Sequence, residues 1–190
     1  MGHMQWNYAY ETLALCTPMA FDCGRLCGAR CCENEAGILD ATNATNATST
    51  TDSGMYLFPG EQERFPGADW YTVQTVLPPV SLEAGSCKDP PKPVLADMLV
   101  CTGSCPRAER PFACRIFPLT PYIPRNGGLV VRMDPRGHEI CPIHKSSELL
   151  PAFVQAVQAA CEAVAQLPDT YAFMWHLSRM LDDVYGLHWT

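Results

Sequence analysis

The organisation of this chain depends on the stretch CGRLCGARCC, which runs from Cys23 to Cys32 and contains four cysteines. Thiolates recur at such short intervals when they converge on one metal ion or one cluster, whereas disulfide partners tend to be spread through a chain. Four cysteines rarely fall so close together by chance. The stretch therefore predicts metal binding more strongly than any other feature of the sequence.

The spacing inside this first cysteine segment limits how its thiols can be used. On a helix, Cys23, Cys27 and Cys31 would lie on one slowly drifting face and could supply three ligands to a single centre. Cys31 and Cys32 are adjacent, so their side chains diverge by ~100° in a helix and point to opposite sides in a strand. The pair could serve different irons or different metals, or one member could be a ligand and the other a core thiol.

A second group of cysteines lies in the segment CTGSCPRAERPFACRIFPLTPY, residues 101–122. Its prolines restrict the backbone and would hold the three thiols in a fixed loop. Cys141, which Pro142 follows, is expected to complete the set, with a buried core thiol as the alternative. The predicted metal ligands are Cys23, Cys27, Cys31, Cys32, Cys101, Cys105, Cys114 and Cys141.

Several residues outside this set are weaker candidates. His144 stands near Cys141 in the sequence, but an ordinary surface or core histidine is the commoner reading, and Cys16 and Cys87 are candidates for an extra ligand. Cys161 falls on the apolar face of a predicted helix and is expected in the core. Arginines in the two cysteine segments would offset the charge of thiolates, unless they are simply solvated. They are Arg25, Arg30, Arg107, Arg110 and Arg115.

Conventional catalytic motifs are missing from the sequence, so an enzymatic activity is left open. It contains no H-E-x-x-H, G-x-S-x-G or phosphate-binding glycine pattern. Glu61, Glu63 and Asp69 are isolated acidic residues, and such residues usually belong to the solvated surface. Tyr122 is expected either to pack over the metal centre or to be an ordinary core aromatic.

Charge and hydropathy exclude several classes of partner. The formal charge of −7 argues against nucleic acid and anionic lipid, because both require an exposed basic stripe. No apolar run approaches the ~20 residues of a membrane-spanning helix. A metal ion or cluster is the partner that the sequence predicts.

Cysteine use indicates a reducing compartment. The chain has 11 cysteines, an odd number, and 190 residues do not need disulfides as a small secreted protein does. No signal peptide is recognisable, which favours a cytoplasmic protein. The start Met1-Gly2-His3-Met4 is typical of an expression-vector remnant, so an original leader could have been removed.

The expected fold is a single irregular α+β domain over residues 5–190. The polar repeat at 41–53 is expected to be a flexible loop, because it has nothing to bury. Apolar residues recur at helical spacing over 146–165 and 169–185, so a helical hairpin is predicted for the C-terminal part, 146–186. Short strands are predicted at 55–58, 70–77, 94–100 and 128–133.

The two cysteine segments resemble the YkgJ-type cysteine-cluster family, described as a zinc- or iron-chelating domain with a CxxCxxCC signature. The resemblance covers roughly Cys23 to Cys141 and rests on the first segment together with RPFACRIFP at 110–118, which is similar to the family's R-P-x-x-C-R-x-F-P. The stretch MYLFPGE at 55–61 also resembles the segment that follows the first cysteines in members of this family. Gaps of three rather than two residues separate the first cysteines, which leaves the metal undetermined.

The resemblance and the ligand chemistry together imply an iron–sulfur cluster or zinc. All-thiolate sites suit both, and the adjacent cysteines favour iron–sulfur, because several irons offer several open corners. We expect a redox, structural or metal-handling role. The family includes flagellin lysine N-methylase, which implies an iron–sulfur-dependent methyltransferase as the alternative. A secreted, disulfide-bonded module is the third class.

Overall fold

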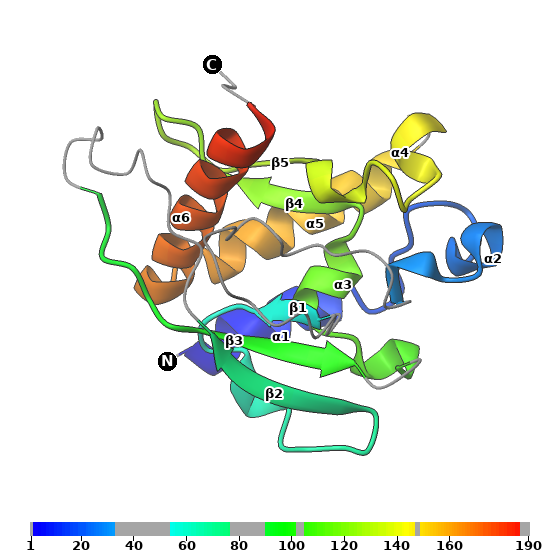
Figure 1. Ribbon diagram of the computed structural model, residues 1–190, viewed down its shortest axis with the longest axis horizontal. Helices are drawn as coiled ribbons and strands as arrows, with labels where there is room; N and C mark the ends of the chain where they lie inside the picture. Colours follow the sequence, from blue (N-terminus) through cyan, green and yellow to red (C-terminus); the bar gives the residue numbers. More distant parts are fainter. Residues whose placement is uncertain (1, 33–53, 77–89, 102–104, 147–148, 187–190) are drawn as a thin grey trace, which may run out of the picture.

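The computed structural model describes residues 2–32, 54–76, 90–101, 105–146 and 149–186 (Figure 1). Over these ranges the chain forms helices and two small antiparallel sheets, and two long helices make up its C-terminal part. The predicted α+β class is therefore confirmed. The predicted loop at 41–53 lies outside the described residues, as does Cys87.

Three of the predicted strands form one antiparallel sheet in the order β1-β3-β2. Their apolar and β-branched residues led to the expected ranges, which agree with the observed ones to within two residues. Leu99 of the central strand lies opposite both Met55 and Val73, and its side chain is buried. The strands are β1 (Gly54–Leu57), β2 (Tyr71–Val76) and β3 (Ala96–Cys101).

A second, two-stranded sheet contains one strand that the sequence did not predict. β4 (Leu119–Tyr122) pairs with β5 (Val130–Met133), and only β5 was expected. Pro121 and its neighbouring prolines indicated an irregular loop. A two-stranded sheet leaves one edge of each strand unpaired, so a proline can be accommodated there. Pro121 lies opposite Val131 in the register.

The predicted pair of C-terminal helices is confirmed, although the first helix starts later than expected. α5 (Pro151–Val164) and α6 (Pro168–Tyr185) both begin with proline, whose missing N–H is no loss in the first turn of a helix. The residues before them form a separate short helix, α4 (Ile143–Ser146). The apolar stripe of α5 is buried as its spacing predicts, at Phe153, Val157, Ala160 and Val164.

The chain starts with helix α1 (Gly2–Thr12), which packs against α5. Gly2, His3 and Met4, expected to be a vector remnant, belong to the same helix. Trp6 and Ala9 face inward and are buried, so α1 is part of the main core.

Aromatic rings connect α1, the end of β1, α3 (Phe112–Ile116) and α6 inside this core. Phe112 meets Trp6 and Phe58 edge-to-face, at centroid distances of 5.4 Å and 5.3 Å. Phe58 in turn meets Phe173 at 5.0 Å. This packing fixes α3, the helix that carries Cys114.

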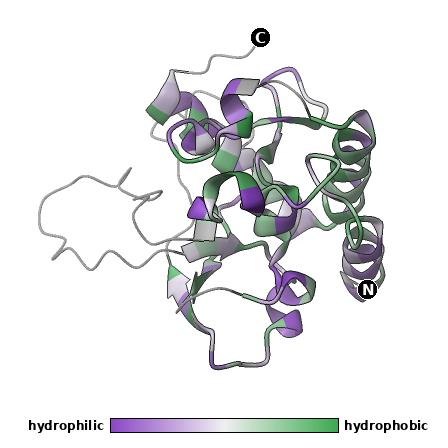
Figure 2. Ribbon diagram, turned by 90° about the vertical axis from the view of Figure 1, so that its right-hand side faces the viewer, coloured by the Kyte–Doolittle hydropathy of each residue, from purple (hydrophilic) through white to green (hydrophobic). Residues whose placement is uncertain are grey.

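Hydropathy along the ribbon follows the same arrangement. Figure 2 shows hydrophobic residues where the helices pack together, and hydrophilic residues both on turns and within helices. Of the helices that the structure describes, none has the length and apolar character required to cross a bilayer.

Replacing Phe112 by alanine should destabilise the fold strongly. Phe112 is 0 % exposed, and removing a buried phenylalanine ring costs about 3–5 kcal/mol through lost transfer energy and the cavity left behind. Urea unfolding measures the difference. Val73→Ala is the control, because Val73 is 41 % exposed and should change stability by less than about 1 kcal/mol. Equal losses in the two variants would contradict the described core.

Candidate metal centre

The first cysteine segment is not the single helix that its spacing allowed. α2 (Gly24–Cys27) is followed by its C-cap residue Gly28, and both Gly28 and Ala29 adopt left-handed backbone angles, with φ of 66° and 63°. A left-handed conformation costs a non-glycine residue roughly 1–2 kcal/mol, so local residue preferences do not explain the break at Ala29. A 3-10 helix, η1 (Arg30–Cys32), follows and carries the last two cysteines.

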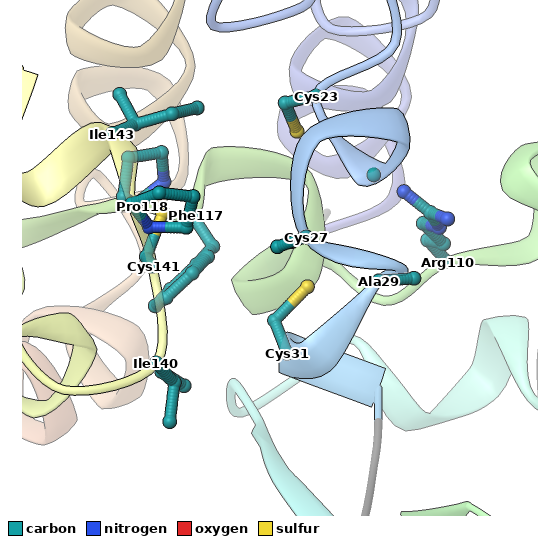
Figure 3. A pocket seen from close by; sticks show the side chains of 12 residues that line it. Cys23, Cys27, Ala29, Cys31, Arg110, Phe117, Pro118, Ile140, Cys141 and Ile143 are labelled. Carbon is teal, nitrogen blue, oxygen red and sulfur yellow. The ribbon is translucent and has the colours of Figure 1, made fainter.

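Despite this break, Cys23, Cys27 and Cys31 line one cavity of about 20 Å³ together with Cys141. The sulfur atoms of Cys23 and Cys31 are directed toward the same space, and Cys141 lies across it (Figure 3). Cys141 comes from the turn before α4, far along the chain from the first segment. Most of the opposite wall is apolar, formed by Phe117, Pro118, Ile140 and Ile143.

The thiols in this cavity affect one another electrostatically. Burial raises the pKa of Cys23, and the nearby Asp22 carboxylate and Cys141 thiol raise it further. Burial also raises the pKa of Cys141, while hydrogen bonds from the backbone N–H groups of Ile143 and His144 act in the opposite direction. Such N–H donors favour the thiolate form and commonly surround the sulfur ligands of metal centres.

A second cysteine cavity of about 30 Å³ adjoins the first, and Cys23 lines both. Its other thiols are Cys114, which was a predicted ligand, and Cys16, which was only a weaker candidate for an extra ligand. Cys16 donates a hydrogen bond from Sγ to the carbonyl oxygen of Thr12 at 3.2 Å. Cations also line this cavity, and all come from the second cysteine segment: Arg107, Arg110 and Arg115.

Other predicted ligands lie elsewhere or are only partly described. Cys101 ends β3 and packs against the small cluster that contains Leu99, and Cys105 comes shortly before the 3-10 helix η4 (Arg107–Glu109). Only the backbone of Cys32 is described. Across the described ranges, no three His, Cys, Asp or Glu side chains are grouped closely enough to hold a metal ion. The eight-cysteine ligand set therefore stays a prediction.

Two further candidates from the sequence have partners of their own. Nε2 of His144 lies 3.0 Å from the carbonyl oxygen of Asp134, so this ring nitrogen is already engaged. Tyr122 is buried and donates a hydrogen bond from its hydroxyl to Asp182 of α6 at 2.7 Å. Burial raises the pKa of Tyr122 to about 12, so the hydroxyl remains protonated at neutral pH. Of the two roles expected for Tyr122, packing over the metal centre or being an ordinary core aromatic residue, its burial supports the second.

The expectation that Glu61 is solvated is wrong, because its side chain is 0 % exposed. Tyr10 donates a hydrogen bond from its hydroxyl to Oε1. The backbone N–H of Phe112 donates to the same oxygen at 2.6 Å, and that of Phe58 donates to Oε2 at 2.9 Å. The sequence offered one signal for this role: Glu61 closes the stretch at 55–61 that resembles the cysteine-cluster family.

The Glu61 contacts extend to the second cysteine cavity through Tyr10. Two guanidinium groups stack on the Tyr10 ring, that of Arg64 at 4.1 Å and that of Arg115 at 4.6 Å. Arg115 also donates hydrogen bonds to the carbonyl oxygens of Arg110 and Ala108, at 2.8 Å and 2.6 Å. One buried carboxylate thus helps to position the arginine-bearing loop beside the cysteines.

Comparison of the chain with family models, curated proteins and solved structures finds no match. The resemblance of the cysteine segments to the YkgJ-type family therefore stays a prediction from the motifs themselves.

Glu61 should make the stability of the protein depend on pH. Burial raises the pKa of Glu61 from 4.5 to about 7, so the folded state retains a proton that the unfolded chain has already lost. The resulting stabilisation is complete below pH 4.5 and is lost as the pH rises through about 7. The free energy of unfolding should fall by up to about 3 kcal/mol across this window.

Urea unfolding of the wild type and of Glu61→Gln, at several pH values from about 5 to about 8, measures this effect. A glutamine side chain cannot titrate, so the variant should lose most of the decline. The same pH dependence in both proteins would contradict the assignment to Glu61.

Proposed function

We propose that this chain is a cytoplasmic metal-binding protein whose clustered thiols hold a zinc ion or an iron–sulfur cluster. The observation that carries the proposal is the position of Cys141. It lies far along the chain from the first cysteine segment, yet it lines the same cavity as Cys23, Cys27 and Cys31. Convergence of distant thiols on one small space is what a thiolate metal site requires.

The donor set fits both kinds of centre. Four cysteines are the usual protein ligands of structural zinc and of common iron–sulfur clusters. The cavity of about 20 Å³ has room for roughly one water-sized sphere. Its size favours a single ion over a cluster in the described conformation, whereas the adjacent Cys31 and Cys32 favoured a cluster. The arginines of the neighbouring cavity would offset the negative charge of either centre.

The structure favours a structural role for the metal over the redox and metal-handling alternatives. No side chain of α2 is buried, so this segment contributes little to the hydrophobic core. A metal held by Cys23, Cys27, Cys31 and Cys141 would instead connect the segment to the turn before α4. When bound, the metal supplies this cross-link, and the chain supplies thiolates, the N–H donors to Cys141 and an apolar wall that limits access of water.

Replacing Cys141 by alanine should lower the metal content of the purified protein severalfold, because one of four ligands is removed. Elemental analysis of protein purified without oxygen measures zinc and iron, and visible absorption distinguishes a coloured iron–sulfur cluster from colourless zinc. Cys161→Ala is the matched control, since Cys161 is also a buried cysteine but lies in the main core. A Cys141→Ala protein with the metal content of the wild type would refute the proposed ligand set.

A further inference from the structure

A third cavity, of about 320 Å³, is far larger than the two that the cysteines line. It lies between the segment that follows η2 (Gln62–Arg64) and the 3-10 helix η4. Binding sites for small molecules have volumes of roughly 300–1,000 Å³ and combine apolar walls with a few polar groups. This cavity has the volume of a site for a small ligand.

The walls of the cavity are rich in aromatic side chains that support one another. Phe65 and Trp70 both meet the ring of Tyr71 edge-to-face, at centroid distances of 5.8 Å and 4.6 Å. Tyr71 is buried in the small core cluster, and its hydroxyl accepts a hydrogen bond from the backbone N–H of Gly67 at 2.8 Å. These contacts preform an apolar surface suited to a flat or branched hydrophobic group.

Two side chains of opposite charge line the same cavity, Arg64 and Glu109. Within the described ranges, Arg64 stacks on Tyr10 and donates one hydrogen bond, from Nη1 to Asn7 at 2.7 Å, which leaves other donors of its guanidinium for a ligand. Oε2 of Glu109 accepts a hydrogen bond from Nε1 of Trp70 at 2.9 Å, which leaves its second oxygen. In the part of the chain that the structure describes, no ion pair joins Arg64 to Glu109.

We propose that this cavity binds a free α-amino acid with a large apolar side chain. The carboxylate of the amino acid pairs with Arg64, its ammonium group pairs with Glu109, and its side chain lies on the aromatic wall. A purely anionic ligand would leave Glu109 unfavourably close, and a purely cationic one would be repelled by Arg64. A zwitterion satisfies both charges at once.

The proposed amino-acid site is separate from the candidate metal centre but shares a structural element with it. Arg107 of η4 lines the second cysteine cavity, whereas Ala108 and Glu109 of the same helix line the aromatic cavity. No group proposed to contact the amino acid is a cysteine. Binding of the amino acid is therefore independent of metal binding.

Calorimetric titration of the full chain with L-phenylalanine tests the proposal, with phenethylamine and 3-phenylpropanoate as probes that lack one charged group each. We expect L-phenylalanine to bind and each probe to bind at least about tenfold more weakly, because one charged hydrogen bond is lost. The same loss is expected for Arg64→Gln and Glu109→Gln with L-phenylalanine. Glutamine at position 109 can still accept the hydrogen bond of Trp70, so this variant removes only the charge.

Glu63→Gln is the matched control, because Glu63 is exposed and pairs with His3 outside the cavity. It should bind L-phenylalanine like the wild type. Arg64→Lys keeps the charge at position 64 and should recover part of the affinity if Arg64→Gln lowers it. The proposal is overturned if L-phenylalanine, L-tyrosine and L-leucine all fail to bind, if 3-phenylpropanoate binds as well as L-phenylalanine, or if the two charge-removing variants bind like the wild type.

Discussion

The hydrogen bonds of the buried Glu61 carboxyl group fix the position of the second cysteine segment against the core. The carboxyl group accepts hydrogen bonds from Tyr10 of α1 and from the backbone of Phe58 and Phe112, and so joins three segments that are distant in sequence. Burying a charged or polar group is costly unless its hydrogen bonds are satisfied, and here three donors satisfy it. Because Phe112 begins α3, the same carboxylate helps to fix the helix that carries Cys114.

Two different kinds of constraint therefore hold the two sides of the candidate metal centre. The wall that Phe117 and Pro118 contribute, directly after α3, is anchored by aromatic packing in the core and by the Glu61 contacts. Among the described residues, the side formed by α2 and η1 has no comparable buried anchor: α2 buries none of its side chains, and the ion pair of Asp22 with Arg107 is exposed. A metal that joins Cys141 to the first cysteine segment would supply the missing constraint, because metal binding and local folding are coupled when the ligands come from separate segments.

Periodic patterns in the sequence predicted much of the secondary structure, because each pattern reflects burial of one face. The stripe from Phe153 to Val164 led to α5, and short apolar runs led to β1, β2, β3 and β5. Predictions from local residue preferences failed where tertiary contacts determine the backbone conformation. β4 was not predicted because it contains Pro121, yet pairing with β5 stabilises this strand. The left-handed angle of Ala29, which divides the first cysteine segment, follows from no residue preference.

The sequence predicted the chemistry of the candidate site better than it predicted which residues lie together there. Cysteine spacing indicated a thiolate centre and included Cys141, but it could not separate Cys101, which packs against the strand cluster, from Cys114, which lies beside Cys23. Spacing also did not assign Cys16 to this group of cysteines, because contacts across the fold, and not its neighbours in sequence, bring it to the cavity that Cys23 and Cys114 line. Isolated acidic residues usually lie on the surface, so the buried role of Glu61 could not be deduced from composition.

X-ray absorption spectroscopy of the natively purified protein, at the edge of whichever metal it contains, tests the central claim most directly. We expect a first coordination shell of sulfur only, with four sulfur neighbours at about 2.3 Å for zinc. For an iron–sulfur cluster we expect sulfur neighbours and a short iron–iron distance. A first shell dominated by nitrogen or oxygen would contradict a centre built from Cys23, Cys27, Cys31 and Cys141.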